Sequence, residues 1–452
     1  MTLILTNSMG GEKQPFTPRD PDEVRIYVCG PTVYNYAHIG NARPAVVFDL
    51  LVRVLERHFG RVIYARNLTD VDDKINAAAA AAGVPISVIT EGFTAAYHAD
   101  MAALGVRPPQ IEPKVTDHIP QIIDLITRLM AAGNAYEAEG HVLYHVPSFP
   151  EYGALSRRKR HEMIAGARIE VAPFKRDLAD FVLWKPSDEK QPGWDSPWGW
   201  GRPGWHIECS AMIEHHLGNP IDIHGGGMDL QFPHHENEIA QGTQARFWIH
   251  NGFVTVDGRK MSKSLGNVLL LRDLLEQAPG EAVRLALLSA HYRQPLGWTG
   301  QTLPQAVRTL SRLYAVVGDG PGDLRLCKNS PLLEQFRAAL DDDLNTPAAM
   351  AELFALADAA RSAGPDLRPR YVCALVEAGA ELGLLQRTEA DWQAELAACG
   401  SAAPDSDHVT ALRDERAAAR ARRDFATADR IRDELLTLGV AVEDRPLEGQ
   451  GA

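Results

Sequence analysis

A short turn between an apolar strand pattern and an amphipathic helix pattern constrains the fold of this chain most strongly. Val24 to Val28 has the strand pattern, Val46 to Leu55 has the helix pattern, and between them lies Ala37-His38-Ile39-Gly40-Asn41-Ala42-Arg43-Pro44. A strand that runs through a glycine turn into a helix is typical of an α/β sheet, and the free backbone amides of the helix start can bind phosphate. The turn therefore predicts a phosphate site, at which His38 can donate a hydrogen bond to charge that develops in the transition state.

A second motif, Lys260-Met261-Ser262-Lys263-Ser264, lies far downstream in a segment bounded by glycines. Either motif alone is weak, because glycine turns and lysine-serine loops are common and usually inert. In this order the two motifs predict a split triphosphate site, with Lys263 as a mobile countercharge on a loop that can close on the nucleotide.

Together these residues resemble the class I aminoacyl-tRNA synthetases, whose signatures are a His-Ile-Gly-His-like turn and a Lys-Met-Ser-Lys-Ser loop. Asn41 stands in place of the second histidine and keeps a hydrogen-bond donor. Residues 27–34 (Tyr-Val-Cys-Gly-Pro-Thr-Val-Tyr) and 66–75 (Arg-Asn-Leu-Thr-Asp-Val-Asp-Asp-Lys-Ile) are similar to the cysteinyl-tRNA synthetase family, and the likeness runs through nearly the whole chain. The resemblance implies activation of L-cysteine with ATP and Mg²⁺ to cysteinyl-adenylate, followed by transfer to tRNA(Cys).

The resemblance also implies which residues act on the nucleotide. His38 and Lys263 are the implied catalytic residues, and Lys263 would stabilise the leaving pyrophosphate. The implied ATP-binding residues are His38, Asn41, Gly225, Gly226, Lys260 and Lys263. Gly225 and Gly226 belong to a glycine triplet that is expected to form a turn after the strand pattern Ile221 to His224, a place where open sheets commonly bind ligands.

Four residues from three segments form a candidate metal site. A helix is expected to begin just before His234, so that His234 and Glu238 share one helix face, whereas His235 is expected to point elsewhere. Cys29 ends the first strand pattern, and Cys209 lies just before the second half of the sheet. Because no Cys-x-x-Cys pair is present, spacing alone leaves two interpretations open: a mixed-ligand zinc site, or two buried cysteines beside a capped helix.

The family resemblance implies the first interpretation, with one Zn²⁺ per chain held by these four residues and the substrate thiolate as a further ligand. Serine differs from cysteine by one atom, and shape selection on so small a difference supplies only about 1–3 kcal/mol. Zinc prefers thiolate and can deprotonate a bound thiol, whereas an alcohol stays protonated and binds poorly. No separate editing domain is therefore expected.

The resemblance further implies four contacts to the substrate cysteine, from Gly30, Thr69, Trp205 and Asp229. Asp229 suits the ammonium group, and Trp205 would form a wall of the side-chain pocket. Each side chain also has a purely structural interpretation. Thr69 could be a strand-end hydroxyl, Asp229 a turn residue and Trp205 part of the core.

The composition is that of a globular protein. The 452 residues, 45% of them hydrophobic, are enough for about three domains. A net charge of -13 argues against a protein that coats nucleic acid indiscriminately. Five scattered cysteines do not indicate a disulfide framework, so at least some are expected as thiols or metal ligands in a reducing compartment. With no long uncharged apolar segment, we expect a cytoplasmic protein without a membrane partner, monomeric by default.

The order of the patterns predicts an α/β chain with a parallel-sheet domain that carries an insertion, followed by an α-helical bundle. The family resemblance implies a Rossmann-like parallel-sheet catalytic domain with an insertion, followed by an α-helical bundle and a small C-terminal anticodon-binding region. The expected segments are the first half of the Rossmann catalytic domain (1–108), a connective insertion (109–203), the second half (204–250), the KMSKS loop and stem-contact region (251–310), the helical bundle (311–400) and the anticodon-binding region (401–452).

Two alternatives stand beside a synthetase. A related ligase that joins cysteine to an amino sugar resembles the same core and metal site, but the complete Lys-Met-Ser-Lys-Ser loop and residues 425–444 favour the synthetase. The chain ends without the family's usual Trp-Arg pair, which leaves aromatic stacking on an anticodon base open. A catalytically silent paralogue is the second alternative, against which His38, Lys263 and the four candidate ligands argue.

Overall fold

The computed structural model describes residues 2–157, 173–189, 191–261, 265–320 and 330–400, together with short pieces between 412 and 431. The chain divides into two compact units, Met1–Gln393 and Ala394–Ala452. Every described residue of the candidate site belongs to the first unit. Lys263 and most of the predicted anticodon-binding region, residues 401–452, lie outside the described residues.

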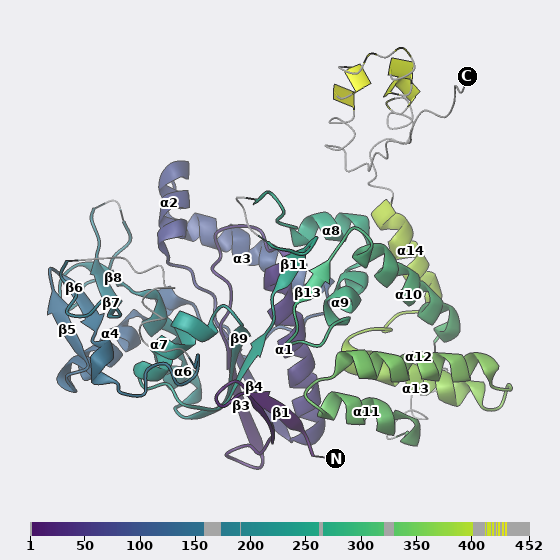
Figure 1. Ribbon diagram of the computed structural model, residues 1–452, viewed down its shortest axis with the longest axis horizontal. Coiled ribbons are helices and arrows are strands. Elements are labelled where there is room, and N and C mark those ends of the chain that lie inside the picture. The colour runs from purple at the N-terminus through teal and green to yellow at the C-terminus, as the bar shows by residue number, and fades with distance from the viewer. Residues whose placement is uncertain are drawn as a thin grey trace, which may run out of the picture. The chain divides into compact units, whose positions relative to one another are not determined.

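A four-stranded parallel sheet forms the centre of the first unit (Figure 1). Its strands lie in the order β10-β9-β3-β4, and they are β3 (Glu23–Val28), β4 (Arg61–Arg66), β9 (Ile221–Gly227) and β10 (Ala245–Asn251). In this sheet β3 pairs Val24 with Val62 of β4 and Ile26 with Ile223 of β9. Because the chain continues from β3 to β4 on one side and later adds β9 on the other, the carboxyl ends of β3 and β9 border a topological switch point.

Helix α1 (Ile39–His58) connects β3 to β4 and packs on the sheet. Val47, Leu51 and Leu55 recur at helical spacing and are all buried, as an amphipathic helix on a sheet requires. The predicted strand Val24 to Val28 is confirmed. The predicted helix pattern Val46 to Leu55 lies inside α1, which begins at residue 39, so residues 39–44 of the predicted turn already belong to the helix.

The residues between β4 and β9 add helices and a second sheet, which Figure 1 shows on the left of the unit. These elements are α2 (Asp73–Ala82), α3 (Ile86–Ala103), the 3-10 turn η1 (Val115–His118), α4 (Ile119–Ala131), the antiparallel strands β5 (Ala135–Ala138), β6 (His141–Tyr144), β7 (Phe181–Pro186) and β8 (Gly201–Pro203), and α6 (Trp205–Leu217). Helix α4 and strand β6 both lie within the segment predicted as a connective insertion. The segment boundaries at 109 and 203 stay predictions.

Smaller elements surround the parallel sheet. They are the hairpin β1 (Ile4–Asn7) and β2 (Glu12–Pro15), the π-helical turn η3 (Gln231–His235), α7 (Glu236–Ala240), the small sheet of β11 (Val254–Val256), β12 (Arg259–Lys260) and β13 (Leu296–Trp298), and the helices α8 (Leu271–Gln277) and α9 (Gly280–Leu288). The predicted glycine turn at residues 225–227 is wrong, because Gly225, Gly226 and Gly227 pair with β10 as the last residues of β9.

Helices dominate the described residues between 301 and 400, and those before residue 394 lie on the right of the first unit in Figure 1. They are α10 (Thr302–Val317), α11 (Glu334–Asp341), α12 (Thr346–Ser362), α13 (Arg368–Leu382) and α14 (Glu389–Gly400). The predicted helical region is confirmed. Asn345 caps α12, since its Oδ1 accepts a hydrogen bond from the backbone N–H of Ala348 at 3.1 Å.

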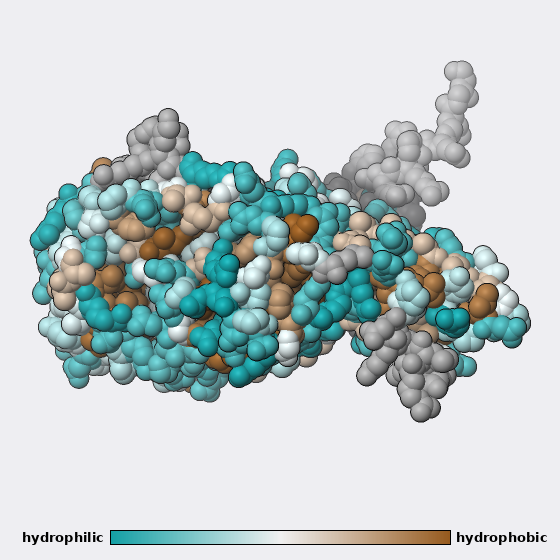
Figure 2. Space-filling model, turned by 90° about the horizontal axis from the view of Figure 1, so that it is seen from below, coloured by the Kyte–Doolittle hydropathy of each residue, from teal (hydrophilic) through white to brown (hydrophobic). Residues whose placement is uncertain are grey.

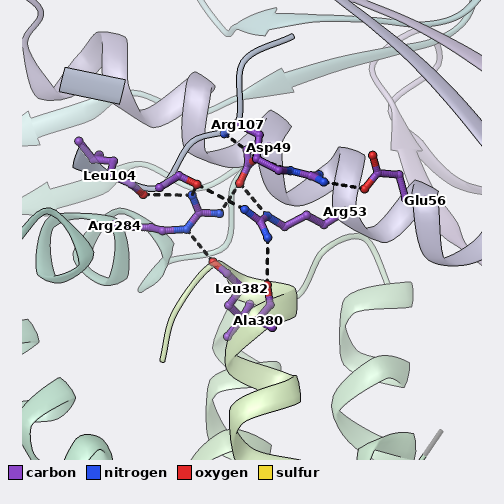
Figure 3. Close-up of polar contacts among 9 residues, drawn as sticks. Asp49, Arg53, Glu56, Leu104, Arg107, Arg284, Ala380 and Leu382 are labelled. Carbon is purple, nitrogen blue, oxygen red and sulfur yellow. Dashed lines mark hydrogen bonds and ion pairs between the residues drawn. The ribbon is translucent and has the colours of Figure 1, made fainter. Parts of the chain in front are cut away.

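A buried ion network joins the sheet region to these helices (Figure 3). Asp49 of α1 accepts a hydrogen bond from Arg284 of α9 at 2.5 Å and one from Arg53 at 2.9 Å. Arg284 also donates to the carbonyl oxygen of Leu382, at the end of α13, and Arg53 donates to that of Ala380. Helix α1, which directly follows His38, is therefore fixed to α9 and α13 by polar contacts as well as by apolar packing.

Within the part of the chain that the structure describes, no single helix is long and apolar enough to span a membrane. Only the bent pair α2 and α3, at 109° to each other, reaches that length and composition when taken together. Figure 2 shows one face of the molecule, on which hydrophilic residues predominate and hydrophobic residues lie in separate patches.

Candidate functional site

The candidate site begins at the end of β3, beside the switch point. The backbone N–H of Cys29 donates to the carbonyl oxygen of Gly225 in β9, and that of Gly30 donates to Oδ1 of Asn67 at 2.9 Å. A Cβ on Gly30 would lie 1.7 Å from the carbonyl oxygen of Asn67, so only glycine fits there. The close approach of these backbones presents the Cys29 side chain at the carboxyl edge of the sheet.

The four predicted metal ligands converge at this edge. Ligand atoms of Cys29, Cys209, His234 and Glu238 all lie within 4.8 Å of one another, and all four residues are buried or half-buried. The two Sγ atoms are 3.5 Å apart, Cys29 Sγ is 3.6 Å from Glu238 Oε1, and His234 Nε2 is 3.0 Å from the same oxygen. Three segments that are distant in sequence thus supply two sulfurs, one nitrogen and one oxygen to one small volume.

Neighbouring side chains orient two of these ligands. The ring of Trp205 stacks on that of His234 with centroids 4.3 Å apart, and His206 Nδ1 lies 3.0 Å from His234 Nδ1. Burial lowers the pKa of His206 to about 3, so the neutral ring can accept the Nδ1–H of His234 and leave its Nε2 as the ligand atom. His224 Nε2 lies 2.8 Å from Glu238 Oε2, which leaves Oε1 toward the other ligands.

The electrostatics of the cluster suit a cation. Burial alone would lower the pKa of His234 and raise that of Glu238. The carboxylate of Glu238 outweighs burial and raises the pKa of His234, and the imidazoles of His224 and His234 together lower the pKa of Glu238. Burial raises the pKa of Cys29, whereas the hydrogen bond from Cys29 lowers that of Cys209. Among the described residues, His234 Nε2 is buried without a hydrogen-bond partner of good geometry. Thiolate, imidazole and carboxylate that face one point are the ligands that zinc takes.

A second set of donors overlaps the first. Cys29, His224, His235 and Glu238 also bring ligand atoms within 4.8 Å of one another. The expectation that His235 points elsewhere is wrong, because its Nε2 is 4.0 Å from Glu238 Oε1. The residues around His234 form the turn η3 rather than a regular α-helix, and this local backbone brings both histidines beside the carboxylate. The hydrogen bond between His224 and Glu238 favours His224 as a supporting residue in the predicted set.

The structure brings the two signature motifs together. The backbone N–H of Ile39 donates to the carbonyl oxygen of Leu269, and that of Leu271 donates to the carbonyl oxygen of Ala37. A Cβ on Gly40 would lie 3.0 Å from the Met261 Cε, so the second motif begins directly beside the first. Lys260 is exposed, with its Nζ 4.9 Å from the centre of the Phe253 ring, whereas Lys263 lies outside the described residues.

Arg43, inside the first motif, ties α1 to the strand that leads to the second. Its fully buried guanidinium donates to the carbonyl oxygens of Gly252 and Phe253 at 2.8 and 2.7 Å, and to that of Gln294 at 2.7 Å. These carbonyls lie next to β11 and β13. The guanidinium therefore fixes the base from which the Lys260 segment extends.

His38 and Asn41 lie at the start of α1. His38 immediately precedes the helix, and its backbone N–H donates to Oδ1 of Asn41 at 3.2 Å. Because that oxygen is used by the backbone, the Nδ2 of Asn41 is the part of the side chain that can donate to a ligand. The expected donor function of Asn41 is compatible with this geometry.

Three of the four residues predicted to contact the amino acid, Gly30, Thr69 and Trp205, have contacts at or next to the cluster. Thr69 is buried and its Oγ1 lies 3.2 Å from Nδ2 of Asn67, while Trp205 keeps 43% of its surface exposed. Asp229 is exposed and follows β9 by two residues. The core interpretation of Trp205 is thus wrong, since the ring covers His234 from the solvent side.

Gly225 and Gly226 have structural reasons to be glycine. A Cβ on Gly225 would lie 2.3 Å from the Phe48 ring of α1, and a Cβ on Gly226 would lie 2.8 Å from Leu230. Their proposed approach to the nucleotide stays a prediction, because close packing alone accounts for both residues.

Asn67, His206 and His224 are the site residues that sequence reasoning missed. Asn67 contacts Gly30, Thr69 and, at 3.8 Å, Cys209. The only signal in the sequence was position, since Asn67 directly follows β4 and His224 precedes the glycine triplet of β9.

The cysteines differ in their state. Cys29, Cys209 and Cys399 are free thiols, as expected for at least some of the five cysteines, whereas Cys373 is disulfide-bonded.

Comparison with known proteins agrees with this geometry. Residues 15–308 match the family described as the tRNA synthetases class I (C) catalytic domain, residues 335–386 match the DALR domain, and residues 406–450 match the cysteinyl-tRNA ligase anticodon binding domain. Among solved structures, methionyl-tRNA synthetase of Mycobacterium tuberculosis is similar in fold, with a TM-score of 0.56 and 16% identity over 80% of this chain and 89% of that chain. The fold and the paired motifs define a class I aminoacyl-tRNA synthetase.

Curated relatives are similar over nearly their whole length. Cysteine-tRNA ligase of Parvibaculum lavamentivorans is 58% identical, covering 99% of this chain and 97% of the relative. The enzyme of the same name from Xanthomonas campestris is 56% identical, covering 98% of this chain and 97% of the relative. The chain belongs to the cysteine-tRNA ligase family. The match to an anticodon binding domain and the names of these relatives favour the synthetase over the amino-sugar ligase.

Proposed function

We propose that this chain charges tRNA(Cys) with L-cysteine and that one Zn²⁺ ion, held by Cys29, Cys209, His234 and Glu238, receives the thiol of the substrate. The observation that carries the proposal is the convergence of these four ligand atoms within 4.8 Å at the switch point of the sheet. Family membership and the adjacent signature motifs support the same reaction. When bound, zinc would supply a preference for a thiolate over the alcohol of serine.

The side chains of this chain would hold the substrate for the first step. Trp205 covers one side of the cluster, and the Asp229 carboxylate would bind the ammonium group. Gly30 and Thr69 would border the amino-acid backbone, with Asn67 between them. Holding both ends of the amino acid places its carboxylate near the nucleotide and lowers the entropic cost of the reaction.

In the first step, the cysteine carboxylate attacks the α-phosphate of ATP and pyrophosphate leaves. His38 and Asn41 would bind the phosphate chain at the start of α1, where backbone amides favour anions. Lys260 and Lys263 would neutralise charge on the leaving pyrophosphate. In the second step, a hydroxyl of the terminal ribose of tRNA attacks the acyl carbon and AMP leaves.

Further parts of the proposal follow from family membership. ATP is used with Mg²⁺, and the six segments predicted from the sequence divide the chain into catalytic, insertion, helical and anticodon-binding regions. The match of residues 406–450 to an anticodon binding domain supports the last of these. We also propose that the protein acts as a monomer in the cytoplasm.

Cysteine-dependent aminoacylation of purified tRNA, measured with a serine control and with zinc content on the same sample, tests the proposal. We expect charging by cysteine alone and one equivalent of zinc per chain. Charging by cysteine at full rate in protein from which all metal has been removed would contradict the role of zinc. An amino-sugar acceptor serves as a negative control for the transfer step.

Lys263→Ala tests the role of the second motif. Loss of a group that stabilises transition-state charge is expected to slow cysteine-dependent pyrophosphate exchange by about 10²–10³-fold. Cysteine binding, measured by titration, should change far less. Equal losses in exchange and binding would contradict the assignment, and Lys13→Ala, at an exposed lysine in β2, provides the matched control.

A further inference from the structure

Three histidines form a cluster apart from the candidate active site. His118 ends η1, whereas His215 and His216 lie in the last turn of α6. One ring nitrogen from each lies within 4.8 Å of the others. Cys209 lies on the same helix seven residues before His216, which corresponds to about 10 Å along the helix axis. None of the three histidines has a role in the proposed aminoacylation.

The hydrogen bonds of His118 leave a ligand atom facing the cluster. Its Nδ1 lies 2.6 Å from the carbonyl oxygen of Lys114. A carbonyl only accepts, so this nitrogen carries the proton, and in the neutral ring Nε2 holds a lone pair. That Nε2 lies 2.7 Å from Nε2 of His216. An imidazole whose far N–H is fixed by a backbone carbonyl has the arrangement that is usual for metal-binding histidines.

The third ring distinguishes a possible ion site from a simple hydrogen-bonded pair. His118 and His216 alone would satisfy each other through one shared proton. His215 is exposed, yet its ring centroid lies 5.5 Å from that of His118 and 4.7 Å from that of His216, so it stays with the pair. Three nitrogens around one point give a cation three ligands.

The position on α6 also favours a cation. His215 and His216 belong to the last turn of a thirteen-residue helix that ends at Leu217. The unpaired carbonyl groups of a helix end carry a partial negative charge, which attracts cations over about one turn. The buried His118 approaches this end from η1.

We propose that His118, His215 and His216 bind a second divalent transition-metal ion, of the zinc, cobalt or nickel type, which joins η1 to the end of α6. Imidazole nitrogens suit these ions, whereas Mg²⁺ and Ca²⁺ take oxygen ligands. Three protein ligands leave at least one position for water. The ion would connect the start of α4 to the helix that carries Cys209, and its binding does not depend on the proposed zinc site.

Cobalt binding to the full chain separates the two sites. Co²⁺ bound by the two cysteines is expected to give an intense sulfur-to-metal charge-transfer band, whereas Co²⁺ bound by three histidines gives only weak d–d bands. Wild-type protein stripped of metal should take up two equivalents at micromolar Co²⁺. Cys209→Ser should lose the charge-transfer band and keep the histidine-bound equivalent.

Two conservative variants test the histidine cluster itself. His215→Gln and His216→Gln should each weaken the histidine-bound equivalent by more than about 100-fold, because loss of even an outer-shell partner costs 10–100-fold. The charge-transfer band should not change in either variant, which also shows that the chain has folded. His98→Gln, at an exposed histidine that contacts Glu112, is the matched control and should bind as wild type.

The proposal is overturned if both variants retain the second equivalent, or if wild-type protein takes it up only at millimolar Co²⁺. Absence of the charge-transfer band in wild type, with histidine-dependent d–d bands present, would instead contradict the proposed zinc site and leave this one standing. A melting temperature that rises on Co²⁺ addition to Cys209→Ser, but not to a Cys209→Ser, His216→Gln double variant, provides an independent check.

Discussion

Two buried clusters of ionisable side chains, one around Cys209 and one around Asp49, differ in how their charges are balanced. Arg284 and Asp49 are 0% and 2% exposed, and each nitrogen of the Arg284 guanidinium has an oxygen acceptor in Asp49 or in the backbone. The other cluster contains thiols, an imidazole and a carboxylate that face one another, with a buried His234 Nε2 that makes no well-oriented hydrogen bond to a described residue.

The difference separates a structural network from a binding site. In the first cluster a permanent positive charge is built into the chain, so the carboxylate is satisfied without any added ion (Figure 3). In the second, Glu238 contacts no lysine or arginine among the described residues, and its carboxylate faces the imidazoles of His224 and His234 and the thiol of Cys29, so a bound cation would supply the permanent positive charge. Perturbed pKa values occur in both, so the identity and geometry of the partners decide between the two interpretations.

The largest expected effect is on the free energy of unfolding, at the cluster around Asp49 and Arg284, which we call the structural cluster. Asp49→Ala leaves Arg284 buried without its carboxylate and should reduce the free energy of unfolding by about 3–5 kcal/mol. Urea unfolding of metal-free protein measures this. Glu56→Ala, at the exposed end of the same network, is the control and should cost less than about 1 kcal/mol. Equal losses of unfolding free energy in Asp49→Ala and Glu56→Ala would show that burial of the ion pair does not determine its contribution to stability.

Cys209→Ser is expected to reduce activity strongly and the stability of the metal-free protein only slightly, which is the reverse of Asp49→Ala. Loss of one ligand should remove the bound metal and slow cysteine-dependent pyrophosphate exchange by about 100-fold or more, a change of about 2.7 kcal/mol. The stability of the metal-free form should change by less than about 1 kcal/mol, because a hydroxyl nearly fills the space of the thiol. Cys399→Ser, at a half-buried free thiol of α14, is the control. Normal metal content in Cys209→Ser would contradict the proposal that the cluster around Cys209 binds the metal.

Acid should weaken the structural cluster over a defined range. Burial alone would raise the pKa of Asp49, but the Arg284 and Arg53 guanidiniums outweigh it and hold that pKa below its usual value. A carboxyl with a depressed folded-state pKa contributes stability above its unfolded pKa of about 3.9 and loses it as the pH falls through the folded value. The difference in unfolding free energy between wild type and Asp49→Ala should therefore be constant from pH 7 to about pH 5 and narrow below about pH 4. A difference that widens in acid would contradict the ion pair.

Sequence patterns predicted the helices and strands whose formation depends on residues close together in the sequence. The strand over Val24 to Val28 and the bundle helices follow from local periodicity, and they are confirmed. The glycine triplet was misjudged because residues 225–227 gain their strand pairing from β10, which no local pattern reveals. The four ligands could be named only through resemblance, since their spacing contains no motif of its own.

Supporting residues were harder to predict, because their partners are distant in sequence. Arg284 and Asp49 are 235 residues apart, and Asn67 and Cys209 are 142 apart. A buried arginine in an apolar helix such as α9 is a signal that could have been used, since a buried charge needs a partner. Which partner it finds depends on the packing of α1, α9 and α13 and not on any local pattern.

The smallest expected effect lies at the exposed edge of the structural cluster. Arg107 keeps 41% of its side chain exposed while it contacts Asp49 at 3.2 Å and Glu56 at 2.8 Å. Arg107→Ala should cost less than about 1 kcal/mol, and salt should reduce that cost further, because solvent screens an exposed pair. Urea unfolding at low and high salt measures both. If Arg107→Ala lost as much unfolding free energy as Asp49→Ala, the contribution of Asp49 would depend on the network as a whole. The small loss that we expect would instead assign that contribution to the fully buried contact between Asp49 and Arg284.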